Sequence, residues 1–457
     1  MAILGPIGYY SDGDAKPLRF HLIDVGEGLM TLIIFPDDTT MLFDCNVRQD
    51  HMEDVLAYLA DHIPVRLDPE LNDFGRWIDI FVNSHRDQDH YRGLSSVNEM
   101  FPVKAIWDSG QTGATIRDAG YEFYMRHRRF LKDKYGNRAL VVPDPSSTSL
   151  ISPGGAQVYC LCSSGEYGSL RFYEPKAEDV YEYREPKVQH TNCIALSIHY
   201  AGRSILLTGD TDWKAWKEKI VPNFDKTGLL KTNVLVASHH GSRSFFREEK
   251  ENRGWWPILR FDDDYLGGIK RIRPSVTLIS CGDYESSHHP NKDALEIYKE
   301  RTAHKQVYTT KEKGGIAGMI DRNGRWTVTP ARFKPSVNHS DSLFDIKCRY
   351  GFFNKELPSG SAIETGTSLK FSVVPGDGLL DPDDKVRIEW EVSHGGINGD
   401  HERQAIYVKP DPLLFSFWKY KFEWEVEYEG RHLIRCRIVN TQKNYDVTRV
   451  FVVDGVK

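Results

Sequence analysis

Residues 84–94, Ser84-His-Arg-Asp-Gln-Asp-His-Tyr-Arg-Gly-Leu94, contain four potential metal ligands within six positions. These ligands are His85, Asp87, Asp89 and His90. A largely apolar run at 77–82 precedes them and predicts a buried strand that delivers the cluster to a strand end. Imidazole and carboxylate together suit a hard-to-borderline divalent metal. Because both ligand types share one tight loop, the pattern indicates two metals side by side, about 3.5–4 Å apart.

Other potential ligands also follow apolar runs, at Asp24, Asp210, His239-His240 and His288-His289. A single charged loop after a strand would need no function, but five strands that each lead to Asp or His favour a shared site. In α/β folds, sites form at the edge where the strands end. We therefore expect these side chains to meet at one edge of a sheet.

The composition bounds the class of protein. The chain has 457 residues, of which 40% are hydrophobic and 27% charged, so two or three globular domains are expected. The net charge of −6 argues against a protein that coats nucleic acid nonspecifically, but it leaves room for a local basic groove. No apolar run reaches the roughly 18 residues of a membrane span, and residues 1–10 do not resemble a signal peptide.

The seven cysteines are odd in number and scattered, and no two of them have CxxC spacing. This pattern predicts reduced thiols rather than a disulfide framework or a zinc knuckle. We therefore expect a cytoplasmic protein without a membrane partner.

Two parts of the chain differ in periodicity. Residues 1–331 alternate short strands with helices, which predicts an α/β domain with an insertion at about 111–190. Residues 332–343 are a plausible linker, and residues 344–457 alternate apolar and polar side chains, which predicts an all-β sandwich or barrel. The expected strands of the first part are 18–25, 30–35, 40–43, 77–82, 103–107, 194–199, 203–207, 234–237, 276–280, 307–310 and 315–320; its expected helices are 51–62, 117–138, 214–220 and 293–302.

Four motifs carry a resemblance to a known family. They are Asp24-Val-Gly-Glu-Gly28, His85-Arg-Asp-Gln-Asp-His90, Leu207-Thr-Gly-Asp210 and His239-His-Gly-Ser242. They resemble the motifs of the metallo-β-lactamase fold and, more narrowly, of the hydrolase domain of ComEC-type DNA-uptake proteins. That subgroup has His-x-Asp-x-Asp-His, an Asn near the third motif, here Asn192, and a His-Pro pair, here His289-Pro290. Over residues 18–325 the resemblance implies an αββα sandwich with two metals at one edge.

The resemblance also implies a role for each matching residue. The implied metal ligands are His85, Asp87, Asp89, His90, Asp210 and His239. The first two would hold one metal and the next two a second, with Asp210 bridging both and His239 or His240 completing the second site. Residues expected to support these ligands are Asp24, His190, Asn192 and His289. Because Asn192 stands where most of the fold has histidine, the first site would be weaker or would prefer Mn²⁺ to Zn²⁺.

The implied chemistry is hydrolysis by direct attack of water. Two divalent metals, Zn²⁺ or Mn²⁺, would lower the pKa of water towards ~7 and polarise a phosphoryl or carbonyl oxygen. Asp89 and His240 are the expected catalytic residues, and the spare histidine of the 239–240 pair would protonate the leaving alkoxide. The alternative for this histidine is support of a ligand. Ser242, Arg243 and Ser244 are the expected phosphate-binding residues, unless Arg243 is a solvated loop residue.

Two basic stretches, 117–138 and 243–273, contain interleaved aromatic residues, including Trp255 and Trp256 in the second. Cations for phosphates among aromatics for stacking suit a single-stranded nucleic acid or a nucleotide. A solvated helix face explains the first stretch almost as well, and a hydrophobic lid or partner patch explains the tryptophan pair better.

The last part of the chain carries a looser resemblance. Glu389-Trp-Glu-Val392 and residues 427–439 resemble the C-terminal sensor domain attached to bacterial nucleotidyltransferases and cyclases of the CBASS antiviral type. The resemblance implies a β-domain that binds a small ligand or a protein partner. The alternative is a generic β-sandwich for partner binding.

Together these patterns predict a metal-dependent phosphodiesterase, namely a nuclease of bacterial antiphage defence regulated by its C-terminal domain. One alternative is a hydrolase of small cyclic nucleotides, and another is a non-catalytic scaffold that senses a ligand. Hydrolysis of a carboxyl ester or lactam is less favoured, because nothing in the sequence resembles an acyl pocket.

Overall fold

The computed structural model describes residues 16–48, 51–68, 73–110, 118–164, 186–248, 264–282, 289–331, 344–351, 354–375, 386–395, 421–426, 429–440 and 445–457. The chain forms two compact units. The first comprises Met1–Asn46, Asp79–Tyr91 and Ala105–Phe333, and the second comprises Val47–Ile78, Arg92–Lys104 and Lys334–Lys457. The expected linker at 332–343 and the Trp255-Trp256 pair lie outside the described residues.

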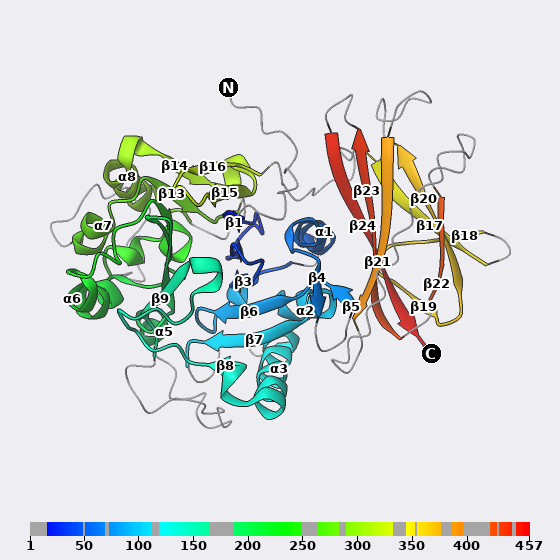
Figure 1. The fold of residues 1–457 in the computed structure, drawn as a ribbon, viewed down its shortest axis with the longest axis horizontal. Coiled ribbons are helices and arrows are strands. Elements are labelled where there is room, and N and C mark those ends of the chain that lie inside the picture. The colour runs from blue at the N-terminus through cyan, green and yellow to red at the C-terminus, as the bar shows by residue number, and fades with distance from the viewer. Residues whose placement is uncertain are drawn as a thin grey trace. The chain divides into compact units, whose positions relative to one another are not determined.

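Eight described strands form one sheet in the order β16-β15-β1-β2-β3-β6-β7-β8 (Figure 1). They are β1 (Leu18–Leu22), β2 (Thr31–Ile34), β3 (Thr40–Phe43), β6 (Ile78–Asn83), β7 (Val103–Asp108), β8 (Leu140–Val141), β15 (Ile316–Ile320) and β16 (Trp326–Pro330). The meander from β16 to β3 is antiparallel, whereas β3 and β6 pair in parallel. The carboxyl ends of β3 and β6 therefore lie at the same edge.

A second sheet has the order β14-β13-β12-β11-β10-β9 among the described strands. Its strands are β9 (Gln157–Cys162), β10 (Ala195–Tyr200), β11 (Arg203–Leu207), β12 (Val234–Val236), β13 (Val276–Ile279) and β14 (Val307–Thr309). From β11 to β14 the pairing is parallel, so these strands end at one edge. Antiparallel pairing of β10 with β11 puts the start of β10 at that edge too.

Alternation along the strands explains why both faces of the six-stranded sheet are buried. Ile205 and Leu207 of β11 belong to a core that also contains Phe20 of β1, so the two sheets share this core. Leu206 points to the opposite face, where it joins a second core that contains Trp216. Near-continuous apolar strands are typical of a sheet covered on both faces. The expectation of an α/β first part is confirmed.

Helices supply the other side of the second core. α6 (Val221–Phe224), α7 (Gly267–Ile272) and α8 (Lys292–Arg301) each contribute buried side chains to it. Short helices α5 (Pro186–Thr191) and α9 (Thr310–Lys313) precede β10 and β15. The predicted helix at 214–220 is a π-helical turn, Ala215–Ile220, that continues into α6. This segment therefore forms a helix where the sequence predicts one, with a wider turn.

Helix α3 (Ala119–Tyr135) packs beside β8 in the first unit (Figure 1). The Asp118 side chain accepts a hydrogen bond from the Tyr121 N–H at 2.9 Å, which caps the helix at its start. The side chains that it buries are Tyr121, Tyr124, Arg128 and Leu131. The helix predicted at 117–138 is therefore present with shorter ends.

The second unit contains two four-stranded sheets, ordered β18-β17-β20-β22 and β19-β24-β23-β21 among the described strands. The strands are β17 (Phe344–Tyr350), β18 (Lys355–Leu357), β19 (Ser361–Glu364), β20 (Ser368–Pro375), β21 (Val386–Gly395), β22 (Lys421–Glu425), β23 (Gly430–Asn440) and β24 (Tyr445–Val456). Phe371 of one sheet and Trp390 of the other belong to one core. The predicted all-β region is therefore present.

Two helices and a small hairpin from the first third of the sequence also belong to the second unit. α1 (Met52–His62) packs on β24, and α2 (Leu94–Met100) packs on β21 and β23. The Arg435 guanidinium pairs with the Asp61 carboxylate, and the hairpin is β4 (Arg66–Asp68) with β5 (Asp73–Gly75). This grouping differs from the expected succession of two continuous domains.

The segment expected as an insertion at 111–190 is more than an insertion. It contains β8, which pairs with β7 in the eight-stranded sheet, and β9, which pairs with β10 in the six-stranded sheet. Neither strand was predicted from the sequence. The segment thus contributes edge strands to both sheets.

No helix among the described residues is both long and apolar enough to cross a membrane. The seven cysteines all lie in described residues, and each is buried and outside any disulfide.

Candidate metal centre

The first half of the site stands where β3 and β6 end. Asp44 follows β3 with a left-handed φ of 56°, and its side chain is fully buried. The Ser84 N–H and hydroxyl donate to its carboxylate at 2.8 and 2.7 Å, and His90 Nδ1 lies 2.7 Å from it. One carboxylate therefore holds the first and last residues of the loop 84–90. A non-glycine residue in this backbone region is strained, which is common at functional sites.

The second half stands at the edge of the six-stranded sheet. Asp210 follows β11 after Gly209, where φ is 48° and a Cβ atom would lie 2.8 Å from Ser84 Cβ. Glycine permits this close approach, which brings Asp210 beside the loop that begins at Ser84. His239 and His240 follow β12 with left-handed φ values of 48° and 53°. Two consecutive strained residues turn this pair toward the same edge.

Asp210 is the central carboxylate of the cluster. Its Oδ2 atom lies 3.4 Å from His90 Nε2 and 3.7 Å from the Nε2 atoms of His85 and His239. The side chain is almost completely buried. Asp210 therefore lies within reach of three histidines that come from different parts of the chain.

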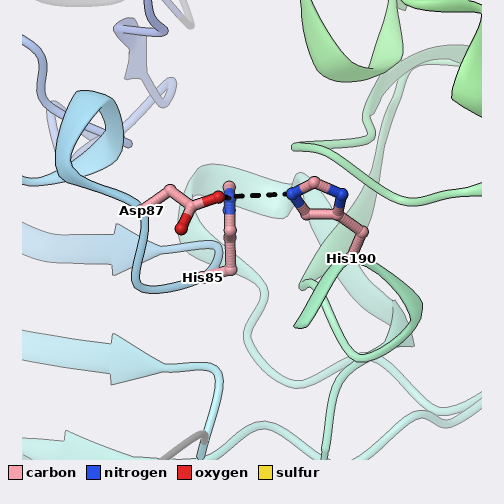
Figure 2. A group of neighbouring side chains, drawn as sticks. All are labelled: His85, Asp87 and His190. Carbon is pink, nitrogen blue, oxygen red and sulfur yellow. Dashed lines mark hydrogen bonds and ion pairs between the residues drawn. The ribbon is translucent and has the colours of Figure 1, made fainter. Parts of the chain in front are cut away.

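A first ligand group is formed by His85, Asp87 and His190, and Figure 2 shows these three side chains converging. Asp87 Oδ2 lies 3.1 Å from His85 Nε2 and 3.3 Å from His190 Nε2. The Gln189 side-chain amide donates to both Asp87 oxygens at 2.8 and 2.7 Å. Gln189 was not predicted, because only the folded chain brings α5 to the loop after β6.

A second ligand group is formed by Asp89, His90 and His240. Asp89 Oδ2 lies 3.3 Å from His240 Nε2 and 3.8 Å from His90 Nε2. His239 belongs to another group, with His190 and Asp210. Both members of the histidine pair therefore lie among the potential metal ligands.

Four histidines of the site share one arrangement. In each, Nε2 lies 3.1–3.7 Å from a carboxylate oxygen of the cluster, while Nδ1 meets another oxygen. The Nδ1 partners are Ser84 Oγ for His85 (3.1 Å), Asp44 Oδ2 for His90 (2.7 Å), Ser244 Oγ for His239 (2.8 Å) and Ser280 O for His240 (3.2 Å). Metal-binding histidines are held this way, because an oxygen partner at one nitrogen fixes the ring and turns the other nitrogen to the metal.

The charges of the cluster depend strongly on one another. Burial alone would raise the pKa of Asp210, but His90, His239 and His240 together lower it well below its usual value. Burial alone would lower the pKa of His90, yet Asp210, Asp44 and Asp89 raise it well above its usual value. The pKa of His239 is lowered by burial and by the neighbouring His190. The carboxylates are therefore held ionised, which is the form that binds a cation.

The atoms of the cluster suit a divalent cation. Within the described residues, His90 Nε2, His240 Nε2 and Asp210 Oδ1 are buried and make no hydrogen bond. A buried polar atom without a partner costs about 1–3 kcal/mol, which a bound cation would offset. Four groups of three residues have ligand atoms within 4.8 Å of one another: His85-Asp87-His190, His85-His90-Asp210, Asp89-His90-His240 and His190-Asp210-His239. These buried groups can hold a metal ion.

All six residues predicted as ligands lie in these groups. They are His85, Asp87, Asp89, His90, Asp210 and His239. His190, which was expected only to support a ligand, and His240, which was expected in catalysis, belong to the same groups. The family resemblance implies Asn192 near the first metal site and therefore a weaker site. His190 lies beside His85 and Asp87 and could supply a third ligand there.

A carboxylate that the sequence analysis did not name lies behind His90. Asp24 was expected to orient a ligand imidazole, and its Oδ1 accepts a hydrogen bond from the Gly26 N–H at 3.2 Å. The carboxylate that contacts the outer nitrogen of His90 is Asp44. Asp44 carries the same sequence signal as Asp24, an acidic residue directly after an apolar strand, and could have been found by it.

The other supporting residues lie at the rim of the cluster. The Asn192 side-chain oxygen accepts a hydrogen bond from the Lys219 ammonium group. The His289 ring centroid lies 5.1 Å from that of His239, which is a potential ligand.

The expected phosphate-binding residues make other contacts. Ser242 Oγ accepts a hydrogen bond from the Ser244 N–H at 3.1 Å, Ser244 Oγ contacts the His239 ring, and both serines are buried. The Arg243 side chain is 39% exposed and lies 3.3 Å from the Asp293 carboxylate. The serines therefore shape the turn and orient His239, and the arginine has an acidic partner.

A buried charge network contacts the loop 84–90, which carries four potential ligands and is here called the metal loop. Arg86 Nη2 lies 3.3 Å from Asp108 Oδ1, and Arg128 Nε of α3 lies 2.9 Å from Asp108 Oδ2. The Tyr124 hydroxyl donates to the same carboxylate. Because Arg86 stands between His85 and Asp87, this network joins the loop to α3.

Cys193 lies against the site without a chemical role in it. Its Sγ atom is 3.8 Å from His85 Nδ1 and accepts a hydrogen bond from the Asp210 N–H at 3.1 Å. Burial and then the charge of Asp210 raise the pKa of this thiol well above its usual value. A thiol that stays neutral is a poor nucleophile, so Cys193 acts as a packing residue.

Comparison with known proteins adds no functional assignment. No family model matches the chain, and no curated protein matches it. An endo-β-1,4-mannanase from Thermotoga petrophila is 10% identical with a TM-score of 0.16, over 40% of this chain and 31% of that chain. An engineered protein is 10% identical with a TM-score of 0.16, over 52% of this chain and 51% of that chain. Function is therefore argued from the site.

Proposed function

We propose that the chain is a metal-dependent hydrolase that cleaves phosphodiester bonds. The observation that carries this proposal is the shared arrangement of the four histidines, whose Nε2 atoms converge on the carboxylates of Asp87, Asp89 and Asp210. A salt-bridge network that serves stability alone does not need several histidines in this arrangement, with Nδ1 bonded to an oxygen and Nε2 directed to a shared group of carboxylates.

The same proposal includes two divalent ions, Zn²⁺ or Mn²⁺, at the four ligand groups. His85, Asp87 and His190 would hold one ion, and Asp89, His90 and His240 the other, with Asp210 shared. When bound, such ions supply Lewis acidity at a phosphoryl oxygen and water with a pKa of about 7.

Other residues of the chain fix the orientation of the proposed ligands. Asp44 and Ser280 O fix the rings of His90 and His240, and Gln189 fixes both oxygens of Asp87. His239 is 16% exposed and lies beside His289 at the rim, so it is the histidine of the pair with access to a substrate. His239 is therefore the histidine of the pair proposed to contact the leaving group, and its lowered pKa keeps it neutral, so it would accept rather than donate a hydrogen bond at Nε2 if Nδ1 carries the proton.

Two further observations favour phosphodiesters. The chain needs no serine or cysteine nucleophile for direct hydrolysis, and α3, which begins beside the metal loop, has five basic and two acidic residues. Positive charge near the centre suits a phosphate-containing substrate. The αββα arrangement and the role in antiphage defence, with regulation by the second unit, rest on the sequence resemblance and belong to the same proposal.

The test is hydrolysis of bis(p-nitrophenyl) phosphate, labelled single- and double-stranded DNA and RNA, and a panel of cyclic dinucleotides, each with Mn²⁺ or Zn²⁺. Asp89→Ala/His90→Ala is compared with Asp133→Ala/His304→Ala, which removes the same side chains from exposed positions. Metal content is measured by mass spectrometry on every variant.

We expect metal-dependent cleavage by the wild type and the control, and its loss in the site variant. Cleavage limited to cyclic dinucleotides would move the function to degradation of a signal. Metal binding without cleavage of any substrate would contradict the proposed activity and favour a ligand-sensing scaffold.

A further inference from the structure

Helix α3 is tied at its start to the metal loop. The Asp118 carboxylate that caps the helix also accepts a hydrogen bond from the Gln88 side-chain amide. Gln88 stands between the potential ligands Asp87 and Asp89. With 17 residues, the helix is about 25 Å long, so it extends from the metal loop well beyond the site.

One side of α3 carries a column of aromatic rings. Phe123, His127 and Phe130 follow one another at helical spacings of four and three residues and are here called the α3 stripe. The ring centroids are 5.7 and 6.0 Å apart, and the ring planes are within 13° and 20° of parallel. Phe130 is 37% exposed, and the other two are partly exposed. A single exposed apolar side chain would need no explanation, but three neighbouring rings form a contiguous, partly exposed aromatic surface.

Cations accompany this stripe. The Arg126 guanidinium lies 5.7 Å from the Phe123 centroid, and the Lys134 ammonium group lies 5.4 Å from the Phe130 centroid. Both basic residues are exposed. The five basic and two acidic residues of α3 give the helix a net charge of +3, whereas the whole chain carries −6. The local charge therefore favours an anionic partner.

We propose that the α3 stripe binds single-stranded nucleic acid and directs it to the metal centre. Bases would stack on Phe123, His127 and Phe130, and backbone phosphates would pair with Arg126 and Lys134. This inference rests on the proposed phosphodiesterase function and names its substrate as a polymer rather than a small nucleotide.

The dimensions suit a strand. Phe123 and Phe130 are seven residues apart, which is about 10.5 Å along the helix and roughly the rise of three stacked nucleotides. A duplex hides its base faces within its own stack, so only an unpaired strand can offer them to the α3 stripe. An acidic protein would satisfy the cations but would leave the parallel rings without flat partners.

The test is binding measured by fluorescence anisotropy in EDTA, so that cleavage cannot occur. The probes are labelled 15-nucleotide oligo-dT and oligo-U and a 15-base-pair DNA duplex, titrated with the full chain at several salt concentrations. The two strands distinguish DNA from RNA, and the duplex separates base stacking from contacts made to phosphates alone.

Two variants change the α3 stripe in different ways. Phe130→Ala removes a stacking surface at an exposed position and should weaken strand binding at least about fivefold. Arg126→Glu/Lys134→Glu should weaken it more and lower the slope of log K against log salt by about 1.4, the value for two lost phosphate contacts on a single strand. The control, Lys292→Glu/Arg301→Glu on α8, makes the same charge change at exposed positions on a helix whose tyrosine is buried.

The expected result is binding of a single strand by the wild type and the α8 control, and weaker binding by both α3 variants. The proposal is overturned if the wild type does not bind a strand, if duplex binds equally well, or if the α3 variants bind like the control. Circular dichroism checks that each variant is folded.

Hydrolysis of bis(p-nitrophenyl) phosphate separates this inference from the proposed function. The wild type and the α8 control should hydrolyse this small ester alike, and the α3 variants should show a raised KM for a strand. Ester hydrolysis without strand binding would sink the α3 proposal alone. Strand binding without any hydrolysis would support the α3 proposal and contradict the proposed activity.

Discussion

At the scale of single residues, the candidate centre depends on side chains that hold other side chains. Asp44 is the clearest case, because its buried carboxylate contacts Ser84 and His90 at once while its backbone is in the left-handed region. Such strain persists where the surrounding contacts over-determine it. Its role is to fix the direction of the His90 ring.

Asp44→Asn is expected to weaken metal binding about 10- to 100-fold, the usual effect of losing a carboxylate behind a ligand histidine. An amide cannot accept hydrogen bonds from Ser84 and His90 through both of its atoms, so the ring loses its fixed direction. The measurement is a competition titration with a chromogenic chelator. Asp133→Asn, an exposed aspartate, serves as the control. Equal affinity in wild type and Asp44→Asn would remove Asp44 from the site.

At the scale of elements, β6, β7 and α3 are joined by one buried network. Asp108 at the end of β7 pairs with Arg86 after β6 and with Arg128 of α3, and all three side chains are buried. Burial alone would raise the pKa of Asp108, but the two guanidinium groups, Arg128 first, lower it. The carboxylate is therefore charged in the folded protein at neutral pH.

Asp108→Asn should reduce the free energy of unfolding by about 3–5 kcal/mol at pH 7, because it leaves two buried cations without their partner. Asp133→Asn, an exposed change on α3, should alter the free energy of unfolding by less than about 0.5 kcal/mol. Urea unfolding followed by tryptophan fluorescence measures both. A loss similar to that of the control would show that the network does not carry the packing of α3.

The lowered pKa of Asp108 also sets a pH dependence. Its contribution to stability is present above the unfolded-state pKa of about 3.9 and is lost as the pH falls through the lower folded-state pKa. The gap between wild type and Asp108→Asn should therefore be full at pH 7 and 5 and should shrink below about pH 4. The same urea titrations at pH 7, 5 and 3.5 measure it. A gap that grew on acidification would have the wrong sign for a depressed carboxyl pKa.

At the scale of the whole molecule, the second unit takes helices from within the sequence of the first part. α1 packs on β24 and α2 on β21 and β23, and Arg435 pairs with Asp61. The chain after α2 returns to the first unit, so the two units are joined by several crossings of the backbone. The boundary expected near 331 therefore lies close to one of these crossings, between Phe333 and Lys334, and the other crossings lie within the sequence of the first part.

A chain that ends at Ala331 should fold poorly. It keeps α1 and α2 but lacks the strands on which they pack, so apolar side chains of these helices would be exposed. We expect stronger binding of a hydrophobic dye, association in sedimentation experiments and a lower melting temperature than the full chain shows. A monomeric fragment with unchanged melting would contradict this grouping of α1 and α2.

Metal removal should affect only the first unit. A ligand bound to the folded state at 100 times its Kd stabilises that state by about 2.7 kcal/mol, and all potential ligands described here belong to the first unit. Scanning calorimetry with and without EDTA should move one transition down and leave the other in place. The Asp89→Ala/His90→Ala variant should show a smaller response to EDTA. Equal shifts of every transition would contradict a centre confined to this unit.

The sequence by itself determined the local features. Alternation predicts β3 and β11 at the residues where they occur, and the helical pattern predicts α1, α3 and α8. The ligand cluster at 85–90 is visible because strand, loop and metal-binding side chains are consecutive. These features depend on residues close together in the chain, and the period of apolar side chains reports them directly.

Only the tertiary structure decided which distant residues complete the centre. Asp44 reaches Ser84 across 40 positions and Gln189 reaches Asp87 across 102, and no local pattern encodes such a pair. Packing likewise decided that His190 lies among the potential ligands. It also decided that α1 and α2 belong to the β-rich unit. The reason is physical: a contact between distant segments follows from how whole sheets and helices bury their apolar faces, which is a property of the complete fold.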